Sequence, residues 1–282
     1  MSEPMDDSKT LGGGGPVKVH DFARRKRAGE PIVMITAYDA LFAFLVDDAG
    51  VDAILVGDSV ATVLGGEETT LSATIDQMIH HGRMVRRGCG RALVVVDMPF
   101  MSYQVSPRDA VRNGGRILKE TGAGAVKLEG GAEVAPAVEA LVTAGVPVMG
   151  HLGFTPQSVH QLGGPRQQAR DHGALETLIR DARALEKAGA FAVVLSTMPG
   201  RIAQKVTHVL SIPTIGIGAG PLCDGQVLML MEMLGLSGGD GAGHSKRYAE
   251  LGSEVREAVA RFAQEVRGGL FPGAEPTGQA VE

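Results

Sequence analysis

The chain has 282 residues, of which 44% are hydrophobic and 21% charged, and its formal net charge is −5. This composition is typical of a globular protein with enough chain to bury a large core. The mild acidity gives no reason to expect a nucleic-acid or membrane-surface partner, and no apolar run reaches transmembrane length. Two cysteines, Cys89 and Cys223, fit neither a disulfide framework nor a zinc site, which favours a reducing cytoplasm.

In chain order, residues 1–16 are polar and glycine-rich and are predicted to be a disordered leader without the pattern of a signal peptide. Val17–Gly29 is predicted to be an extra N-terminal helix that plugs the bottom of the fold. Short apolar runs rich in β-formers follow. They are 32–39, 52–59, 92–100, 125–131, 146–154, 191–199, 212–220 and, with a pattern that equally suits a helix, 227–233.

Helical segments separate most of these runs, for example Pro107–Thr121, Glu133–Ala144 and Ala174–Ala188, and several end in Ala-Gly, which is typical of a helix C-terminus. Apolar strands that alternate with helices predict a parallel sheet covered on both faces. Eight units in about 250 residues predict one (β/α)8 TIM barrel over 17–271, followed by a flexible tail, 272–282. A doubly wound open sheet is the alternative.

Polar residues follow five consecutive strands, at the ends where barrel enzymes carry their active sites. They are Asp58, Ser59, Asp97, Lys127, Glu129, His151 and Ser196. Residues two apart in a strand share a face, so Lys127 and Glu129 are either an ion pair on an exposed edge strand or a pair delivered into a site. A terminal Asp is equally a common helix cap.

Three carboxylates, Asp58, Asp97 and Glu129, converging on one mouth require a cation. Oxygen ligands without clustered His or Cys favour Mg2+. Lys127 beside such a cluster is placed to stabilise an oxyanion, and Mg2+ with Lys suits enolisation of a 2-oxo acid. The long segment 155–173 is predicted to be a lid or binding loop, and "GIGAG" at 216–220 lacks the dinucleotide fingerprint.

Seven motifs occur in order between Val17 and Pro272: "TAYD", "ILVGDS", "DMPFMSY", "VKLEGG", "GHLGFTPQSV", "IGIGAG" and "CDGQVL". Together they resemble the ketopantoate hydroxymethyltransferase family. The resemblance implies a Mg2+-dependent barrel of the phosphoenolpyruvate/pyruvate type. It implies transfer of a hydroxymethyl group from 5,10-methylenetetrahydrofolate to 3-methyl-2-oxobutanoate through a Mg-stabilised enolate, giving 2-dehydropantoate in pantothenate biosynthesis. It also implies a cytoplasmic homo-oligomer, commonly a decamer.

The resemblance also implies roles for individual residues. Asp58 and Asp97 are metal and substrate positions, and Glu129 is a metal ligand. Ser59 and Lys127 contact the oxo acid, and His151 helps to bind it.

The chain departs from the family pattern at the proton acceptor, which is a glutamate in the family and Ser196 here. A serine is not a base at neutral pH without activation. His160, in the predicted lid, is either a surrogate base or an exposed loop histidine, and His151 is the rival. The lid sequence at 163–169 also differs from the family. The alternatives are therefore a diverged Mg2+ enzyme for another 2-oxo acid and a non-catalytic paralogue.

Overall fold

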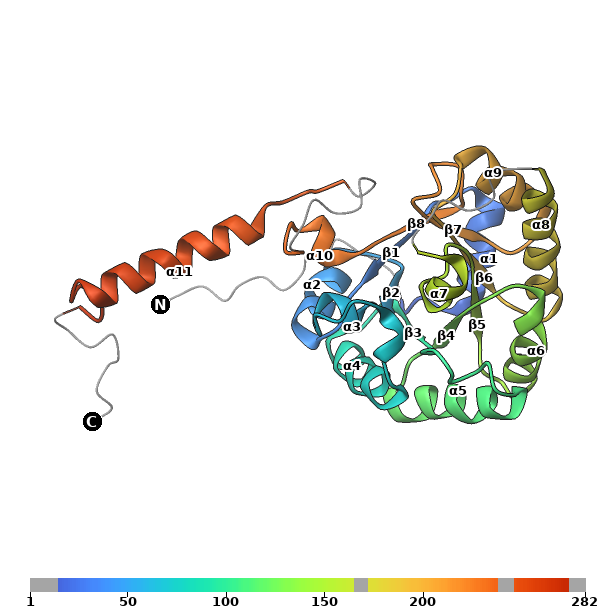
Figure 1. The fold of residues 1–282 in the computed structure, drawn as a ribbon, viewed down its shortest axis with the longest axis horizontal. Helices are drawn as coiled ribbons and strands as arrows, with labels where there is room; N and C mark the ends of the chain where they lie inside the picture. Colours follow the sequence, from blue (N-terminus) through green and yellow to red (C-terminus); the bar gives the residue numbers. More distant parts are fainter. Residues whose placement is uncertain (1–14, 165–171, 238–245, 274–282) are drawn as a thin grey trace. The chain divides into compact units, whose positions relative to one another are not determined.

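The structure, a computed structural model, describes residues 15–164, 172–237 and 246–273 and contains a closed barrel of eight parallel strands (Figure 1). The predicted leader and tail lie almost wholly outside the described residues. The chain divides into two compact units, 1–229, which holds the barrel, and 230–282. The strands are β1 Ile32–Thr36, β2 Ala53–Val56, β3 Leu93–Asp97, β4 Ala125–Glu129, β5 Val148–Gly153, β6 Ala192–Ser196, β7 Thr214–Ile217 and β8 Gly225–Leu228.

The first unit contains the barrel and nine of the described helices (Figure 1). They are α1 Val19–Ala28, α2 Ala40–Asp48, α3 Val60–Val63, α4 Ile75–Gly88, α5 Pro107–Thr121, α6 Ala135–Thr143, α7 Val159–Leu162, α8 His172–Lys187 and α9 Gly200–Val209. Three short 3-10 turns are η1 Thr70–Ser72, η2 Ala132–Val134 and η3 Pro156–Ser158. The second unit contains α10 Leu230–Met233 and α11 Leu251–Arg267. No helix in the described ranges is both long and apolar enough to cross a membrane.

The pairing of the first and last strands excludes the open-sheet alternative. Ile32 of β1 lies opposite Gly225 of β8, and Met34 lies opposite Val227, so the sheet closes on itself. The (β/α)8 prediction is confirmed. The eighth strand begins two residues before the predicted run, at Gly225, and Leu230–Met233 is helical.

The helix α1 packs against the interior of the barrel through Phe22. The Phe22 ring is fully buried and joins the core cluster of residues that point inwards from the strands, including Ile32, Met34 and Ala53. It also makes an edge-to-face contact with Phe191, with ring centroids 5.3 Å apart. The predicted N-terminal plug is thus present.

The barrel interior changes from apolar to polar along the strands. On β4 the inward positions, two residues apart, are Ala125, Lys127 and Glu129. Ala125 belongs to the apolar core cluster. Lys127 and Glu129, nearer the C-terminal end of the strand, are 4% and 5% exposed. The interpretation of β4 as an exposed edge strand is therefore wrong, because β4 pairs on both sides.

Candidate active site

Five buried polar side chains gather at the C-terminal ends of β2 to β5, and we call them the polar cluster. Its members are Asp58, Asp97, Lys127, Glu129 and His151. Strand register places them together, because Asp97 lies opposite Lys127 and Glu129 lies opposite His151. Asp58 comes from the turn directly after β2. The cluster brings together five of the seven side chains predicted from strand ends.

Lys127 is the one ammonium group of the polar cluster. Its Nζ lies 3.0 Å from Asp97 Oδ1 and 3.3 Å from His151 Nδ1. Burial alone lowers the pKa of a lysine, but the charges of Asp97, Glu129 and Asp58 outweigh burial and raise the pKa of Lys127. Lys127 is therefore a charged group held inside the barrel.

Glu129 is the carboxylate with the fullest set of partners. His151 Nδ1 lies 3.2 Å from its Oε1, and the Gln157 backbone N–H donates to its Oε2 at 2.9 Å. Burial opposes ionisation, but His151, Lys127 and the Gln157 N–H together lower the pKa of Glu129. The other nitrogen of His151, Nε2, is buried and has no hydrogen-bond partner among the described residues.

The two aspartates are less well compensated. The Asp58 backbone N–H donates to Asp97 Oδ2 at 3.1 Å, and Gln157 Nε2 donates to Asp58 Oδ2 at 2.9 Å. Burial, followed by the charges of Asp97 and Glu129, raises the pKa of Asp58 to about 7. Burial also raises the pKa of Asp97, although Lys127 opposes the change. The site thus holds more carboxylates than its own cations stabilise.

The carboxylate oxygens of the polar cluster are chemically suited to a hard divalent cation, but they do not form a complete coordination shell. Asp97 Oδ1 has its ion pair with Lys127 but no well-directed hydrogen bond from the described residues. Carboxylate oxygens suit Mg2+, which keeps several coordination positions for water or substrate. In the described part of the chain, no three His, Cys, Asp or Glu side chains form a metal-holding group. Asp58 and Asp97 are the carboxylates with capacity left for an ion.

The remaining predicted residues lie around the polar cluster. The Ser59 hydroxyl bonds to the Tyr38 hydroxyl at 2.9 Å. Ser196 is buried at the end of β6, and its Oγ lies 3.3 Å from Thr197 Oγ1. Thr197 has a φ of 50°, a left-handed conformation unusual for a β-branched residue. His160 is exposed on α7, and no hydrogen bond within the described ranges joins its side chain to the polar cluster.

Sequence reasoning missed Gln157 and Tyr103, which tie the polar cluster to the surrounding loops. Besides its bonds to Asp58 and Glu129, Gln157 accepts from the Tyr103 hydroxyl through Oε1 at 2.7 Å. Tyr103 Oη also accepts from the Glu129 N–H at 3.1 Å. Both residues lie in quoted motifs, "DMPFMSY" and "GHLGFTPQSV", which were the available signal.

The sequence of the whole barrel matches the model of one protein family. Residues 16–274 match ketopantoate hydroxymethyltransferase. The chain belongs to this family. A 3-methyl-2-oxobutanoate hydroxymethyltransferase of Prosthecochloris aestuarii is 51% identical over 92% of this chain and 94% of the relative. One of Nitratidesulfovibrio vulgaris is 52% identical over 97% and 89%. The predicted family and the predicted kind of enzyme are confirmed.

Solved structures of other enzymes share the fold at low sequence identity. A 2,3-dimethylmalate lyase, described as a member of the PEP mutase/isocitrate lyase superfamily, has a TM-score of 0.58 at 17% identity, covering 93% of this chain and 92% of its own. A phosphonopyruvate hydrolase in complex with oxalate and Mg2+ has a TM-score of 0.60 at 12% identity, covering 94% and 92%. These likenesses show that the chain shares the barrel fold of these enzymes.

Proposed function

We propose that this ketopantoate hydroxymethyltransferase family member transfers a hydroxymethyl group from 5,10-methylenetetrahydrofolate to 3-methyl-2-oxobutanoate and forms 2-dehydropantoate. The observation that carries the proposal is the match over residues 16–274 to a family whose curated relatives bear the name of this reaction. The polar cluster supports it, because a buried ammonium among carboxylates is suited to a charged oxo acid.

Asp58 and Asp97 would supply carboxylate oxygens to a bound Mg2+, since both have raised pKa values and weak compensation. The ion would polarise the carbonyl of the oxo acid and acidify its C3 proton. Glu129 would be the third carboxylate at the ion. Its oxygens contact Gln157 and His151, so Glu129 would share an oxygen with the ion or act on it through its negative charge.

Lys127 and the residues beside it would hold the substrate. The Lys127 ammonium is fixed against Asp97 and is placed to stabilise negative charge that develops on the oxo acid. Ser59 Oγ and His151 Nε2 are further polar groups for the carboxylate or carbonyl of the oxo acid. Burial of the whole cluster excludes bulk water and strengthens each of these interactions.

The acceptor of the C3 proton is the point where this chain departs from its family. Ser196 has only the Thr197 hydroxyl as a side-chain partner in the described structure, so nothing there activates it as a base. A histidine, His151 or His160, or a water molecule beside Ser196 then has to accept the proton. This same observation favours the second candidate, a Mg2+-dependent enzyme of another 2-oxo acid or a paralogue that binds without turnover.

We also propose a homo-oligomer of this chain in the cytoplasm. The helix α11 has no buried residue and carries an apolar stripe, Val255, Val259, Phe262 and Val266, at helical spacing. Such a stripe requires a partner surface, and the family resemblance makes a second copy of the chain the expected partner. The two free cysteines support a reducing compartment.

The decisive experiment separates enolisation from one-carbon transfer. Deuterium exchange at C3 of 3-methyl-2-oxobutanoate is followed by NMR with Mg2+ and without folate, and transfer is then assayed with 5,10-methylenetetrahydrofolate. The proposal expects both reactions. Exchange and transfer both absent with this acid, but exchange present with another 2-oxo acid, would establish the second candidate.

Three variants identify the base. If the site merely lacks a base, Ser196→Glu should raise the C3 exchange rate by about 10²- to 10⁴-fold, the usual range for general-base assistance. If the chemistry has moved to a new base, Ser196→Glu should lower the rate, and His160→Ala or His151→Ala should abolish exchange. His160→Ala with a wild-type exchange rate would remove His160 from the mechanism.

A further inference from the structure

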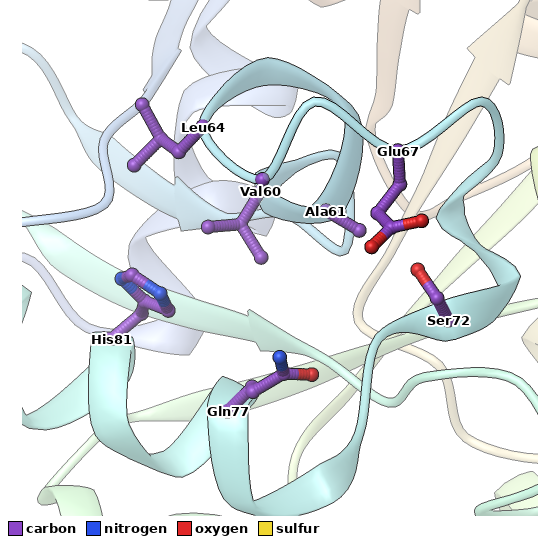
Figure 2. Close-up of a pocket in the computed structure, with 8 residues that line it drawn as sticks. Val60, Ala61, Leu64, Glu67, Ser72, Gln77 and His81 are labelled. Carbon is purple, nitrogen blue, oxygen red and sulfur yellow. The ribbon is translucent and has the colours of Figure 1, made fainter.

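A hollow of about 250 Å³ lies between α3, the loop that follows it and the start of α4 (Figure 2). Apolar walls come from Val60 and Leu64, and polar side chains come from Glu67, Ser72, Gln77 and His81. None of these six residues belongs to the polar cluster. Pockets for drug-sized ligands span about 300–1,000 Å³, so this hollow suits one fused-ring group and not a larger molecule.

The polar walls have hydrogen-bonding capacity that the protein does not use. Gln77 Oε1 accepts from the Thr74 N–H at 2.8 Å and from its hydroxyl at 3.0 Å, which leaves the amide NH2 as a donor. His81 Nδ1 donates to the Tyr38 carbonyl at 2.8 Å, so Nε2 is left as an acceptor. No hydrogen bond or ion pair within the described residues occupies the Glu67 carboxylate, which faces the hollow in Figure 2.

These groups match a flat heterocycle of one kind. A carboxylate accepts two parallel hydrogen bonds from a ring N–H and the amino group beside it. The Gln77 amide can donate to a ring carbonyl next to that N–H, and the Val60 and Leu64 side chains offer an apolar surface for the ring face. A 2-amino-4-oxopteridine, the ring system of a reduced folate, carries this order of amino group, N–H and carbonyl.

The hollow is linked to the candidate active site by a neighbouring residue in the chain and by hydrogen bonds of Tyr38. Val60, in its wall, directly follows Ser59, whose hydroxyl bonds to that of Tyr38. The carbonyl of the same Tyr38 holds His81 on the opposite wall. The turn η1, which ends at Ser72, contacts η3, which carries Gln157. Tyr38 and the contact between η1 and η3 thus connect the hollow to the candidate active site.

We propose that this hollow is the subsite for the pteridine end of the folate co-substrate, with the Glu67 carboxylate accepting from the ring N–H and the 2-amino group. The proposal rests on the proposed one-carbon transfer. It goes beyond that function by assigning the pteridine to α3, η1 and α4, outside the polar cluster. The rest of the folate extends from there towards solvent, because the hollow has room for the ring system alone.

The test measures binding of the two halves of the co-substrate to the full-length protein, anaerobically and by calorimetry. The probes are tetrahydrofolate, 6-methyltetrahydropterin and p-aminobenzoylglutamate. The variant is Glu67→Gln, which keeps the size of the side chain and removes its charge. The matched control is Glu68→Gln, because Glu68 is the next residue, is also exposed and does not line the hollow.

Glu67→Gln should weaken the binding of tetrahydrofolate and of 6-methyltetrahydropterin by about 10- to 100-fold, which is the usual contribution of a charge-assisted pair of hydrogen bonds. Its affinity for p-aminobenzoylglutamate and its rate of C3 exchange should equal those of the wild type. Glu68→Gln should leave every measurement unchanged. Equal pterin affinity in the two variants would overturn the proposal, and so would equal losses for both halves of the folate.

The C3 exchange measurement keeps this proposal separate from the proposed function. If the wild-type protein fails to exchange C3 yet binds pterin through Glu67, the proposed reaction is wrong and the subsite stands. If exchange proceeds normally in both variants and pterin binding does not depend on Glu67, the reaction stands and the subsite is wrong.

Discussion

Lys127 and its three carboxylate neighbours show how single residues set the chemistry of the barrel interior. One ammonium group cannot compensate Asp58, Asp97 and Glu129 together, and the deficit falls on the two aspartates, whose pKa values are raised. Buried charges without partners are costly. The excess of buried carboxylates therefore predicts that the site binds a cation. Two variants, one at each aspartate, test this prediction.

Asp97→Asn should abolish Mg2+-dependent binding of 3-methyl-2-oxobutanoate. It removes one of the two carboxylates that have capacity for the ion, and losses of more than about 100-fold are expected because even outer-shell changes cost 10- to 100-fold. Calorimetry with Mg2+ and with EDTA measures the effect. Asp76→Asn is the control, since Asp76 is exposed and pairs with Arg116 on the surface. Wild-type binding by Asp97→Asn would remove Asp97 from the metal site.

Asp58→Asn should stabilise the metal-free protein above pH 7. The pKa of Asp58 is raised from 3.8 to about 7, so its contribution to stability is fully present below about pH 4 and is lost as the pH rises through 7. That difference corresponds to at most about 4 kcal/mol. Thermal unfolding in EDTA between pH 5 and 8 should show a falling Tm for the wild type and a flatter profile for the variant. Added Mg2+ should stabilise the wild type, not the variant. A variant with the same pH profile as the wild type would contradict the assignment.

At the scale of the elements, α1 and the strand ends divide the barrel into a closed apolar half and a polar half. The plug depends on Phe22, which is fully buried among inward-pointing residues of the strands and against Phe191. The charged face of α1 instead anchors the helix to the base of the barrel, through Arg25 with Asp52 and Lys26 with Asp224. The packing of Phe22 and the two ion pairs of α1 do not involve the C-terminal ends of the strands, where the polar cluster lies.

Phe22→Ala should destabilise the protein by about 3–5 kcal/mol, the usual cost of truncating a buried phenylalanine. Denaturant unfolding measures the change. Arg27→Ala on the same helix is the control and should lie within about 0.5 kcal/mol of the wild type, because Arg27 is exposed. A loss no larger than that of the control would show that α1 does not plug the barrel.

The grouping of the site residues could be predicted from the sequence because the C-terminal ends of successive strands meet at one mouth of a barrel. This reasoning placed Asp97, Lys127, Glu129 and His151 together. It could not find the bond from Gln157 to Asp58, because that contact joins residues 99 apart in the chain and one of them lies in the turn η3. It also misplaced the start of β8, since pairing with β1 overrides the weak strand preference of Gly225.

At the scale of the whole molecule, each of the two units, taken by itself, leaves apolar side chains exposed among its described residues. On α11 the stripe of Val255, Val259, Phe262 and Val266 is 47–60% exposed. On α2, Leu41, Phe44 and Leu45 form a second exposed apolar surface. Surfaces of this kind mark interaction sites, in agreement with the proposed homo-oligomer.

Phe262→Lys should lower the native mass of the assembly, because a charge in the middle of the stripe is costly to bury. Light scattering after size exclusion should give a multiple of 29.3 kDa for the wild type and a smaller multiple for the variant. Glu257→Lys, an exposed change outside the stripe, should keep the wild-type mass. A wild-type protein that elutes as a monomer would contradict the oligomer outright.

The plugged base of the barrel has a kinetic consequence. Phe22 and the core cluster fill one end of the barrel. Both substrates therefore have to enter, and both products have to leave, at the C-terminal ends of the strands. In the proposed function the oxo acid would lie deepest, against Lys127, and the folate would lie nearer to solvent. Turnover should therefore follow a compulsory order, with the oxo acid first in and its product last out. In steady-state inhibition experiments, 2-dehydropantoate should compete with the oxo acid and not with the folate.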